Sequence, residues 1–535
     1  MQPAIVHDGM AAVYWSSDTN TLSHVSPIAM DEIASKRESE LRPGESDGAD
    51  ATLVAALSGP ATMTPVEKGG IGQAGKSSHE LKALHGLRFF AAFCILFSHA
   101  CSWLANFKDS KTIYSFGDIF TVFGMPLFFV LSGFVIHYNY SRLFSTMRPR
   151  WAIVEFLGAR FARIYPLFIC FFLIGMAVDE VLLWYPDHKL NLFLVLAHFL
   201  TLTQSWVYIV LFGDRMLLDG PFGLSWSLST EFFFYVFYVL LVLHLTRLRG
   251  IISLLMTAGA MSVLVLAVFA YAAGHREAIA AFARQQMNDQ FGRSDRSAFW
   301  WFFYYSPYGR VFEFILGCLT AQIYALLPER PVSSREARGG RVLLMGSLVF
   351  LGAFALTYRF APFGPVVQIY VELLKLNFVC AVAIAAVIFC VSRYRSSAFA
   401  LILSTPLMVS LGDLSYSIYT VHTWTLRIFE RPQMTFSTAR GWEAVFRIVL
   451  AIALTIILST ATYRFIEVPA RAWLRKVVAR HLLRKFGARE TNMLSDVRIY
   501  SSSAAMVFAV SFVVMIGGLL IYQFLIVPHY APYTR

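Results

Sequence analysis

The stretch Leu84–Leu104 reads LHGLRFFAAFCILFSHACSWL and is the first strongly apolar run of the chain. At about 1.5 Å per residue, a helix of these 21 residues would be about 30 Å long, which matches the hydrocarbon thickness of a bilayer. The run therefore predicts a membrane-spanning helix. Arg88 and His99 lie within this run, and such ionisable residues are costly in hydrocarbon and by default mark a functional site.

The composition of the whole chain agrees with a membrane protein. Of its 535 residues, 57% are hydrophobic and 15% are charged, and the mean hydropathy is +0.58. Soluble domains contain about 25% charged residues, so much of this surface must face lipid. The net charge of +12 does not indicate a nucleic-acid partner, because the basic residues fall between apolar runs, as the positive-inside rule expects.

Eleven apolar runs predict an all-α, polytopic bundle of membrane-spanning helices. They cover roughly 84–104, 116–138, 164–184, 226–246, 251–272, 308–327, 342–360, 370–391, 400–425, 443–465 and 503–527. A twelfth run, 194–212, is ambiguous. No internal repeat is visible, which weakens the prediction of an inverted-repeat transporter.

The distribution of basic residues orients the spans. With a cytoplasmic N-terminus and without a crossing at 194–212, the densest basic loops fall inside. We therefore expect 194–212 to be re-entrant or interfacial on the outer face, and the tail after 527 to lie outside. The loop residues that support this orientation are Arg142, Arg148, Arg150, Arg160, Arg163, Arg247, Arg249, Arg330, Arg335, Arg338, Arg341, Arg393, Arg395, Arg471, Arg475, Lys476, Arg480, Arg484, Lys485 and Arg489.

These patterns divide the chain into four segments. Residues 1–83 are polar and contain no signal peptide, so they predict a disordered cytoplasmic tail. Residues 84–475 form the transmembrane domain, 476–502 a basic cytoplasmic linker, and 503–535 an extra transmembrane helix with a short extracytoplasmic tail. The six cysteines lie in or beside apolar runs and show neither metal-ligand spacing nor a disulfide framework.

Arg88 and His99 are expected on nearly the same face of the first helix. They are eleven residues apart, which is three helical turns or about 16 Å. Arg88 would lie near the cytoplasmic end and His99 in the outer half. A snorkelling anchor would explain Arg88 and a hydrogen-bonded packing histidine would explain His99, but their shared face favours a functional role for both.

A second arginine pair precedes the third run. Arg160 and Arg163 share a helix face at i, i+3, and guanidinium is well suited to bind phosphate. Ordinary positive-inside flanking explains the pair equally well.

Further ionisable residues are expected near the outer ends of the spans. Glu231 needs a partner there, and Arg310 or His99 could provide it. For Glu313, a local ion pair with Arg310 at i, i+3 is the favoured interpretation. His422 also maps to the outer end.

The small pair Ser132-Gly133 favours close helix packing over a nucleophilic role.

In the residues described above and the motifs around them, the chain resembles the membrane-bound acyltransferase-3 family over about residues 80–475. Seven motifs occur in the order typical of that family. They are Arg-x10-His at Arg88 and His99, Phe-Phe-x-x-Ser-Gly-Phe at Phe128 to Phe134, Arg-x-x-Arg at Arg160 and Arg163, Trp-Ser-Leu-x-x-Glu-x-x-Phe-Tyr from Trp226 to Tyr235, Arg-x-x-Glu-Phe-x-x-Gly from Arg310 to Gly317, Leu-Gly-x-x-Ser-Tyr-Ser-Ile-Tyr-x-x-His from Leu411 to His422, and Glu-x-Pro-x-Arg from Glu467 to Arg471.

The resemblance implies a ten-helix core, an acyl-CoA donor (acetyl-CoA in the simplest case) and a carbohydrate or glycolipid acceptor. It implies no metal. It also implies that Arg88 and His99 are essential and that Arg160 and Arg163 lie near the donor. The last apolar run, 503–527, would add one C-terminal helix to this core. Some members carry an extracytoplasmic esterase-like domain after the extra helix, which is not expected in a chain ending at Arg535.

These observations lead to the hypothesis of an O-acyltransferase in the plasma (bacterial inner) membrane. We expect His99, Arg88 and Glu231 to be catalytic, with His99 as general base and Glu231 as its orienting partner. A covalent acyl-histidine is the alternative. A transporter or flippase for an anionic or lipid-linked solute is the rival function, and a membrane scaffold would leave the buried charges unexplained. The residues expected to bind substrate are Arg160, Arg163, Trp226, Arg310 and His422.

Overall fold

The computed structural model describes residues 81–104, 111–178, 189–211, 215–292, 294–328, 330–361, 364–430 and 441–491. The tail 1–80 and the expected span 503–527 lie outside these residues. The described part is almost entirely helical, and its strands are the two-residue pairs β1 (Val210–Leu211) and β2 (Arg215–Met216). The expectation of an all-α polytopic protein is confirmed.

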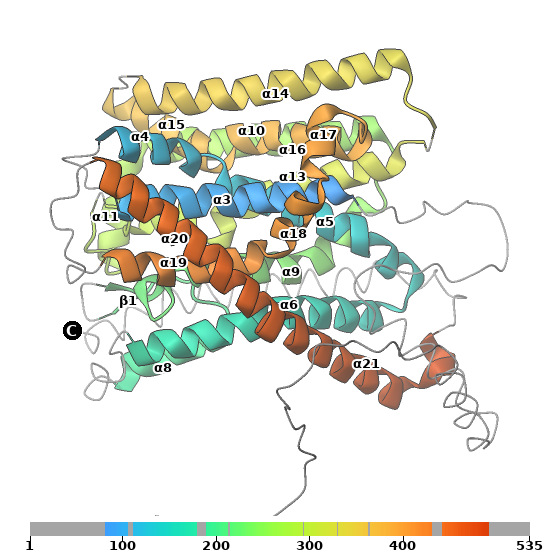
Figure 1. Ribbon diagram of the computed structural model, residues 1–535, viewed down its shortest axis with the longest axis horizontal. Coiled ribbons are helices and arrows are strands. Elements are labelled where there is room, and N and C mark those ends of the chain that lie inside the picture. Colours follow the sequence, from blue (N-terminus) through green and yellow to red (C-terminus); the bar gives the residue numbers. More distant parts are fainter. Residues whose placement is uncertain are drawn as a thin grey trace, which may run out of the picture. The chain divides into compact units, whose positions relative to one another are not determined.

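Most of the helices of the described residues lie roughly along one common axis (Figure 1). In chain order they begin with α3 (Lys82–Leu104), α4 (Lys111–Thr121), α5 (Gly124–Thr146), α6 (Pro149–Val178), α8 (Lys189–Leu200), α9 (Trp226–Leu245), α10 (Ile251–Gly274) and α11 (Arg276–Gln286). They continue with α13 (Pro307–Leu326), α14 (Ser334–Phe360), α15 (Pro365–Asn377), α16 (Val379–Arg393), α17 (Ala398–Leu403), α18 (Pro406–Asp413), α19 (Ser415–Glu430), α20 (Gly441–Thr462) and α21 (Val468–Thr491).

Nine helical segments within the described residues are long and apolar enough to cross a membrane. They are Lys82–Leu104, Ser115–Thr146, Pro149–Val178, Gly223–Leu245, Ile251–Gly274, Ala298–Leu326, Ser334–Phe360, Val367–Arg393 and Gly441–Val478. Each overlaps one of the runs expected from the sequence. One bound differs in a way that matters for the site. The third helix begins at Pro149 rather than near 164, so Arg160 and Arg163 lie inside α6 instead of before it.

The expected span 400–425 is divided into α17, α18 and α19, instead of forming one helix. The first break precedes Pro406, which has no backbone N–H to donate and is therefore well suited to the first turn of a new helix. The second is a turn at Leu414. These breaks bring the N-terminal end of α19 and its polar side chains into the interior of the bundle.

The ambiguous segment 194–212 contains a short helix followed by turns. Helix α8 has 12 residues, or about 18 Å, and is too short to cross about 30 Å of hydrocarbon. After it, the Trp206 indole N–H donates to the carbonyl of Ser229 at 3.0 Å, and Tyr308 donates to the carbonyl of Trp206 at 3.0 Å. These bonds fasten the segment to α9 and α13, in keeping with a re-entrant rather than a spanning segment.

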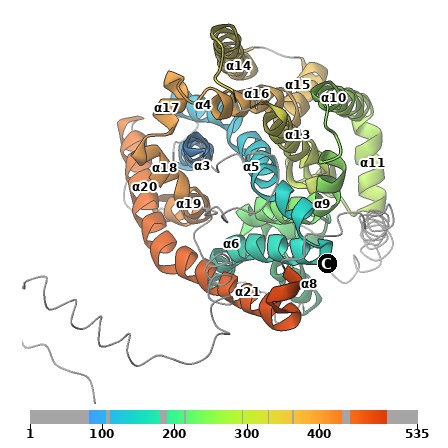
Figure 2. The ribbon, with the colours of Figure 1, turned by 90° about the vertical axis from the view of Figure 1, so that its right-hand side faces the viewer.

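Helix α3 lies among its neighbours rather than at the edge. It packs against α4, α5, α18, α19 and α20, which surround it in the end-on view of Figure 2. In contrast, α10 and α14 expose long apolar side chains such as Leu255, Val263, Val342 and Val349, as expected of lipid-facing helices. The polar residues of α3 are therefore presented to other helices.

Helices α5 and α13 cross at a contact that only small residues permit. A methyl group on Gly133 would lie 2.0 Å from the Phe314 carbonyl oxygen, and one on Gly317 would lie 2.0 Å from the Val130 carbonyl oxygen. The backbones therefore approach as closely as in other small-residue contacts between membrane helices. The packing role expected for Gly133 is confirmed.

Candidate active site

Two histidines from distant parts of the sequence meet near one end of the bundle. His99 Nδ1 on α3 lies 3.0 Å from His422 Nε2 on α19, and the two rings are stacked with centroids 5.2 Å apart. Trp103, one turn after His99, also stacks on the His99 ring, with ring centroids 5.9 Å apart. His422 is completely buried, whereas His99 is partly exposed. An incoming molecule could therefore reach His99 but not His422.

The hydrogen bonds of His422 determine which nitrogen of His99 carries the proton. The Nδ1 of His422 lies 2.6 Å from the carbonyl oxygen of Tyr419, which can only accept, so this nitrogen is the donor. In a neutral ring the Nε2 of His422 is then an acceptor, and His99 must donate to it from Nδ1. The Nε2 of His99 is left with the lone pair that a general base requires.

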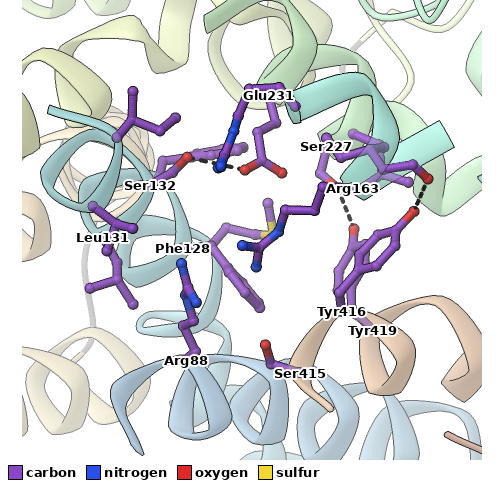
Figure 3. A pocket seen from close by; sticks show the side chains of 17 residues that line it. Arg88, Phe128, Leu131, Ser132, Arg163, Ser227, Glu231, Ser415, Tyr416 and Tyr419 are labelled. Carbon is purple, nitrogen blue, oxygen red and sulfur yellow. Dashed lines mark hydrogen bonds between the residues drawn. The ribbon is translucent and has the colours of Figure 1, made fainter. Parts of the chain in front are cut away.

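A second set of polar side chains lines a cavity between α3, α5, α6, α9 and α19 (Figure 3). Arg88, Arg163 and Glu231 point into the same space from three different helices. The cavity has a volume of about 70 Å³, enough for only a few water molecules. A larger ligand could enter only if the lining side chains moved.

The cavity carries excess positive charge. Three arginines and one carboxylate are among the described residues that line it, which gives 3 − 1 = +2. Arg160 donates to the Tyr140 hydroxyl at 2.6 Å and lies over its ring. Among the described residues neither Arg88 nor Arg163 takes part in an ion pair. An anionic ligand would therefore be attracted to this space.

Glu231 belongs to this cavity and does not orient His99. Its Oε1 accepts hydrogen bonds from the Ser132 hydroxyl at 3.1 Å and from the Tyr235 hydroxyl at 2.7 Å. The predicted Glu231–His99 pair is therefore wrong, and the side chain that contacts His99 Nδ1 is that of His422. The reason is depth, because Glu231 faces the middle of α5 at Ser132 rather than the outer turns of α3.

Arg310 does not line the cavity but is enclosed by other side chains. It is fully buried, with its Nε 3.0 Å from Glu313 Oε2 and its Nη1 donating to Asn377 Oδ1 at 2.7 Å. The local ion pair expected for Glu313 is thus confirmed. Neither Glu313 oxygen receives an aligned hydrogen bond from the described residues, so the attraction between the two charges holds this pair.

Trp226 also lies in the packed interior. It is 5% exposed and contacts the rings of Phe129, Tyr304 and Tyr305. Neither Trp226 nor Arg310 lines the cavity that holds Arg88. The structure thus brings together Arg88, Arg160, Arg163 and Glu231 in one group and His99 with His422 in another.

Tyrosines and serines that were not predicted from the sequence complete the site. Tyr416 and Tyr419 line the cavity from α19, and the Tyr419 hydroxyl lies 2.6 Å from that of Ser227. Tyr140 was missed as the partner of Arg160. The i, i+3 spacing of Tyr419 and His422 could have suggested that they share a helix face, although not their hydrogen bond.

Comparison with known proteins gives a family match and several distant relatives. The model of the acyltransferase domain family matches residues 81–464. The O-acetyltransferase OatA of Staphylococcus aureus (strain NCTC 8325 / PS 47) is 23% identical over 410 residues, covering 74% of this chain and 58% of the relative. Acyltransferase MdmB of Streptomyces mycarofaciens is 25% identical over 378 residues, covering 70% of this chain and 86% of the relative.

Nodulation protein 10 of Rhizobium leguminosarum bv. viciae matches a shorter stretch. It is 28% identical over 162 residues, which are 28% of this chain and 41% of the relative. The chain spans only about 58% of the length of OatA. No solved structure gives a significant match.

The buried Arg310–Glu313 pair generates a prediction about stability. Arg310→Met should lower the free energy of unfolding by roughly 3 kcal/mol, because it leaves the Glu313 carboxylate buried without its counter-charge. The double variant Arg310→Met/Glu313→Leu should recover most of this loss. Thermal unfolding of the detergent-purified protein measures both effects. A double variant as unstable as the single one would show that the ion pair is not the origin of the loss.

Proposed function

Because this chain belongs to the acyltransferase-3 family, we propose that it transfers an acyl group from acyl-CoA, in the simplest case acetyl-CoA, to a hydroxyl group of a carbohydrate or glycolipid. The donor would enter from the cytoplasmic side and the acceptor from the extracytoplasmic side. The observation that carries this proposal is the His422–His99 pair, which leaves a basic nitrogen on a partly exposed ring. The names of the relatives OatA and MdmB support an acyl transfer reaction.

In the proposed reaction, His99 Nε2 removes the proton of the acceptor hydroxyl as its oxygen attacks the thioester carbonyl carbon. The tetrahedral intermediate collapses, the carbon–sulfur bond breaks, and the imidazolium returns the proton to the leaving thiolate. The products are the acyl ester and free coenzyme A. During the step His422 accepts the Nδ1–H of His99 and so keeps the ring oriented while it is charged.

The arginines of the cavity are assigned to the donor. Arg88 lies eleven residues before His99 on α3, or about 16 Å along the helix, so it does not touch the reacting atoms when His99 does. We assign Arg88, Arg160 and Arg163 to the phosphate-bearing part of the donor, with which guanidinium groups form strong charge-assisted bonds. Glu231 lines the same cavity and is assigned to this donor group.

We further propose the plasma membrane as the location and a cytoplasmic N-terminus. Arg-rich ends of α6, α14 and α21 support this orientation by the positive-inside rule. It places Arg88 toward the side that supplies the donor and His99 toward the side that supplies the acceptor.

The orientation can be tested by labelling. Cysteine introduced at the exposed residue Ser294, after α11, should react with an impermeant maleimide in intact cells. Cysteine at the exposed Lys476 on α21 should react only after permeabilisation. Native cysteines contribute little background, because five of the six are buried. The reverse labelling pattern would invert the assignment of donor and acceptor sides.

The donor assignment predicts a defect in binding. Arg163→Ala should weaken the affinity for a non-hydrolysable acyl-CoA analogue by about 1.5–3 kcal/mol, measured by titration calorimetry. Arg150→Ala is the matched control, since Arg150 lies on the same helix but is exposed and does not line the cavity. If both variants bound the acyl-CoA analogue with equal affinity, Arg163 would be a positive-inside flanking residue rather than a donor-binding one.

The proposed function itself is tested by release of free coenzyme A from acyl-CoA by the purified protein in the presence of a glycan acceptor. His99→Gln should lower the rate by about 10²–10⁴-fold, because an amide cannot take up the proton. Donor binding should remain. A transporter would release no thiol in the wild type. An acyl adduct on His99 after incubation with donor alone would replace the general-base step with a covalent one.

His422 provides a second arm of the same assay. His422→Leu removes the acceptor for His99 Nδ1 and should lower turnover by up to about 100-fold, with the KM for donor unchanged. His422→Gln keeps an acceptor oxygen and should recover part of the rate. If Leu and Gln had equal effects, His422 would be a packing residue rather than a positioning residue.

A further inference from the structure

A second, larger cavity lies at the end of the bundle where α13 ends, α14 begins and α16 leads into α17. Its volume is about 900 Å³. Five arginines line it, namely Arg330, Arg338, Arg341, Arg393 and Arg395. It shares no described lining residue with the cavity that contains Arg88. It is therefore a separate site, and the proposed acyl transfer makes no use of it.

Most of its positive charge is not neutralised by the described residues. Arg393 is paired with Glu336 at 2.9 Å. Arg395 donates to the neutral Tyr324 hydroxyl at 3.0 Å. Among the described residues Arg338 and Arg341 form no ion pair. Five arginines and the adjoining Glu336 give 5 − 1 = +4, so this cavity attracts anions, and guanidinium groups favour phosphate.

The arginines adjoin an apolar surface that faces lipid. Directly after Arg341, helix α14 carries exposed apolar residues, with exposed fractions of 69% for Val342, 52% for Met345 and 69% for Val349. A ligand with a phosphate at one end and acyl chains at the other would satisfy both surfaces at once. A soluble phosphate compound would leave the apolar half of this surface uncovered.

We propose that this cavity binds an acidic phospholipid, with the headgroup phosphate on Arg338 and Arg341 and the acyl chains along the exposed face of α14. Basic pockets between transmembrane helices bind anionic headgroups by the same physics. The apolar cavity residues Leu327 and Val332 would contact the glycerol and the first methylenes. The site requires neither acyl-CoA nor a glycan and is independent of the transfer reaction.

The test compares lipid retention by the full chain. The wild type and the double variant Arg338→Gln/Arg341→Gln are purified from detergent containing equal phosphatidylglycerol and phosphatidylcholine, and bound lipid is measured by native mass spectrometry. The wild type should retain phosphatidylglycerol preferentially. The double variant should lose about 30-fold in affinity for it, which corresponds to about 1 kcal/mol for each arginine.

Arg335→Gln is the matched control, because Arg335 lies in the first turn of the same helix but does not line the cavity. It should retain phosphatidylglycerol like the wild type. Arg341→Glu provides a second variant if the double variant is recovered in low yield, and its charge reversal should abolish the preference. Equal retention in the double variant and the control would overturn the proposal.

Competition with soluble phosphates separates the two sources of phosphate. Inorganic pyrophosphate and coenzyme A should not displace the bound phosphatidylglycerol at concentrations that saturate the Arg163 site. The lipid proposal is wrong if two results occur together. Pyrophosphate or coenzyme A displaces phosphatidylglycerol from the wild type, and the double variant loses coenzyme A binding while it keeps its lipid preference. The cavity would then be a nucleotide-phosphate site.

Discussion

The cost of placing ionisable groups in hydrocarbon governs where every polar residue of this bundle lies. Such groups persist only where other polar groups or water compensate them. Helix α3 meets this constraint by being surrounded by other helices, so that Arg88 faces a cavity and His99 faces His422. The same constraint explains the buried Arg310–Glu313 pair. The lipid-facing helices α10 and α14, which lack this protection, expose apolar side chains.

This constraint separates the interior into two polar groups with different chemistry. One is cationic and enclosed, with three arginines around Glu231. The other consists of the His99–His422 pair, whose hydrogen bonds leave a basic nitrogen on the more exposed ring. About three turns of α3 separate them. In the proposed reaction, a donor with a charged end and a distant thioester would contact both groups, whereas an acceptor would need to reach only His99.

Much of this arrangement follows from sequence patterns that depend on one helix alone. Run lengths predicted the nine candidate spans of the described residues, and i, i+3 spacing predicted the Arg310–Glu313 pair. Contacts between helices were not predictable in the same way. Glu231 was expected beside His99 because the depth of each residue in the membrane was judged from its position along its own apolar run. That estimate placed Glu231 too close to the outer surface. Hydropathy also began the third helix near 164, although packing extends α6 back to Pro149 and buries Arg160.

The division of the 400–425 run explains how the two polar groups are connected. Pro406 and the turn at Leu414 separate α19 from the preceding helices, so that α19 lines the cavity that contains Arg88 and also holds His422. Tyr419 belongs to both: its side chain lines the cavity and contacts Ser227, while its carbonyl oxygen accepts the Nδ1–H of His422. The cavity is too small for a donor unless its lining moves. Any movement of the Tyr419 backbone that widens it would also shift the group that sets the tautomer of His99. In the proposed reaction, binding of the donor in this cavity and the tautomer of His99 would therefore be coupled through Tyr419.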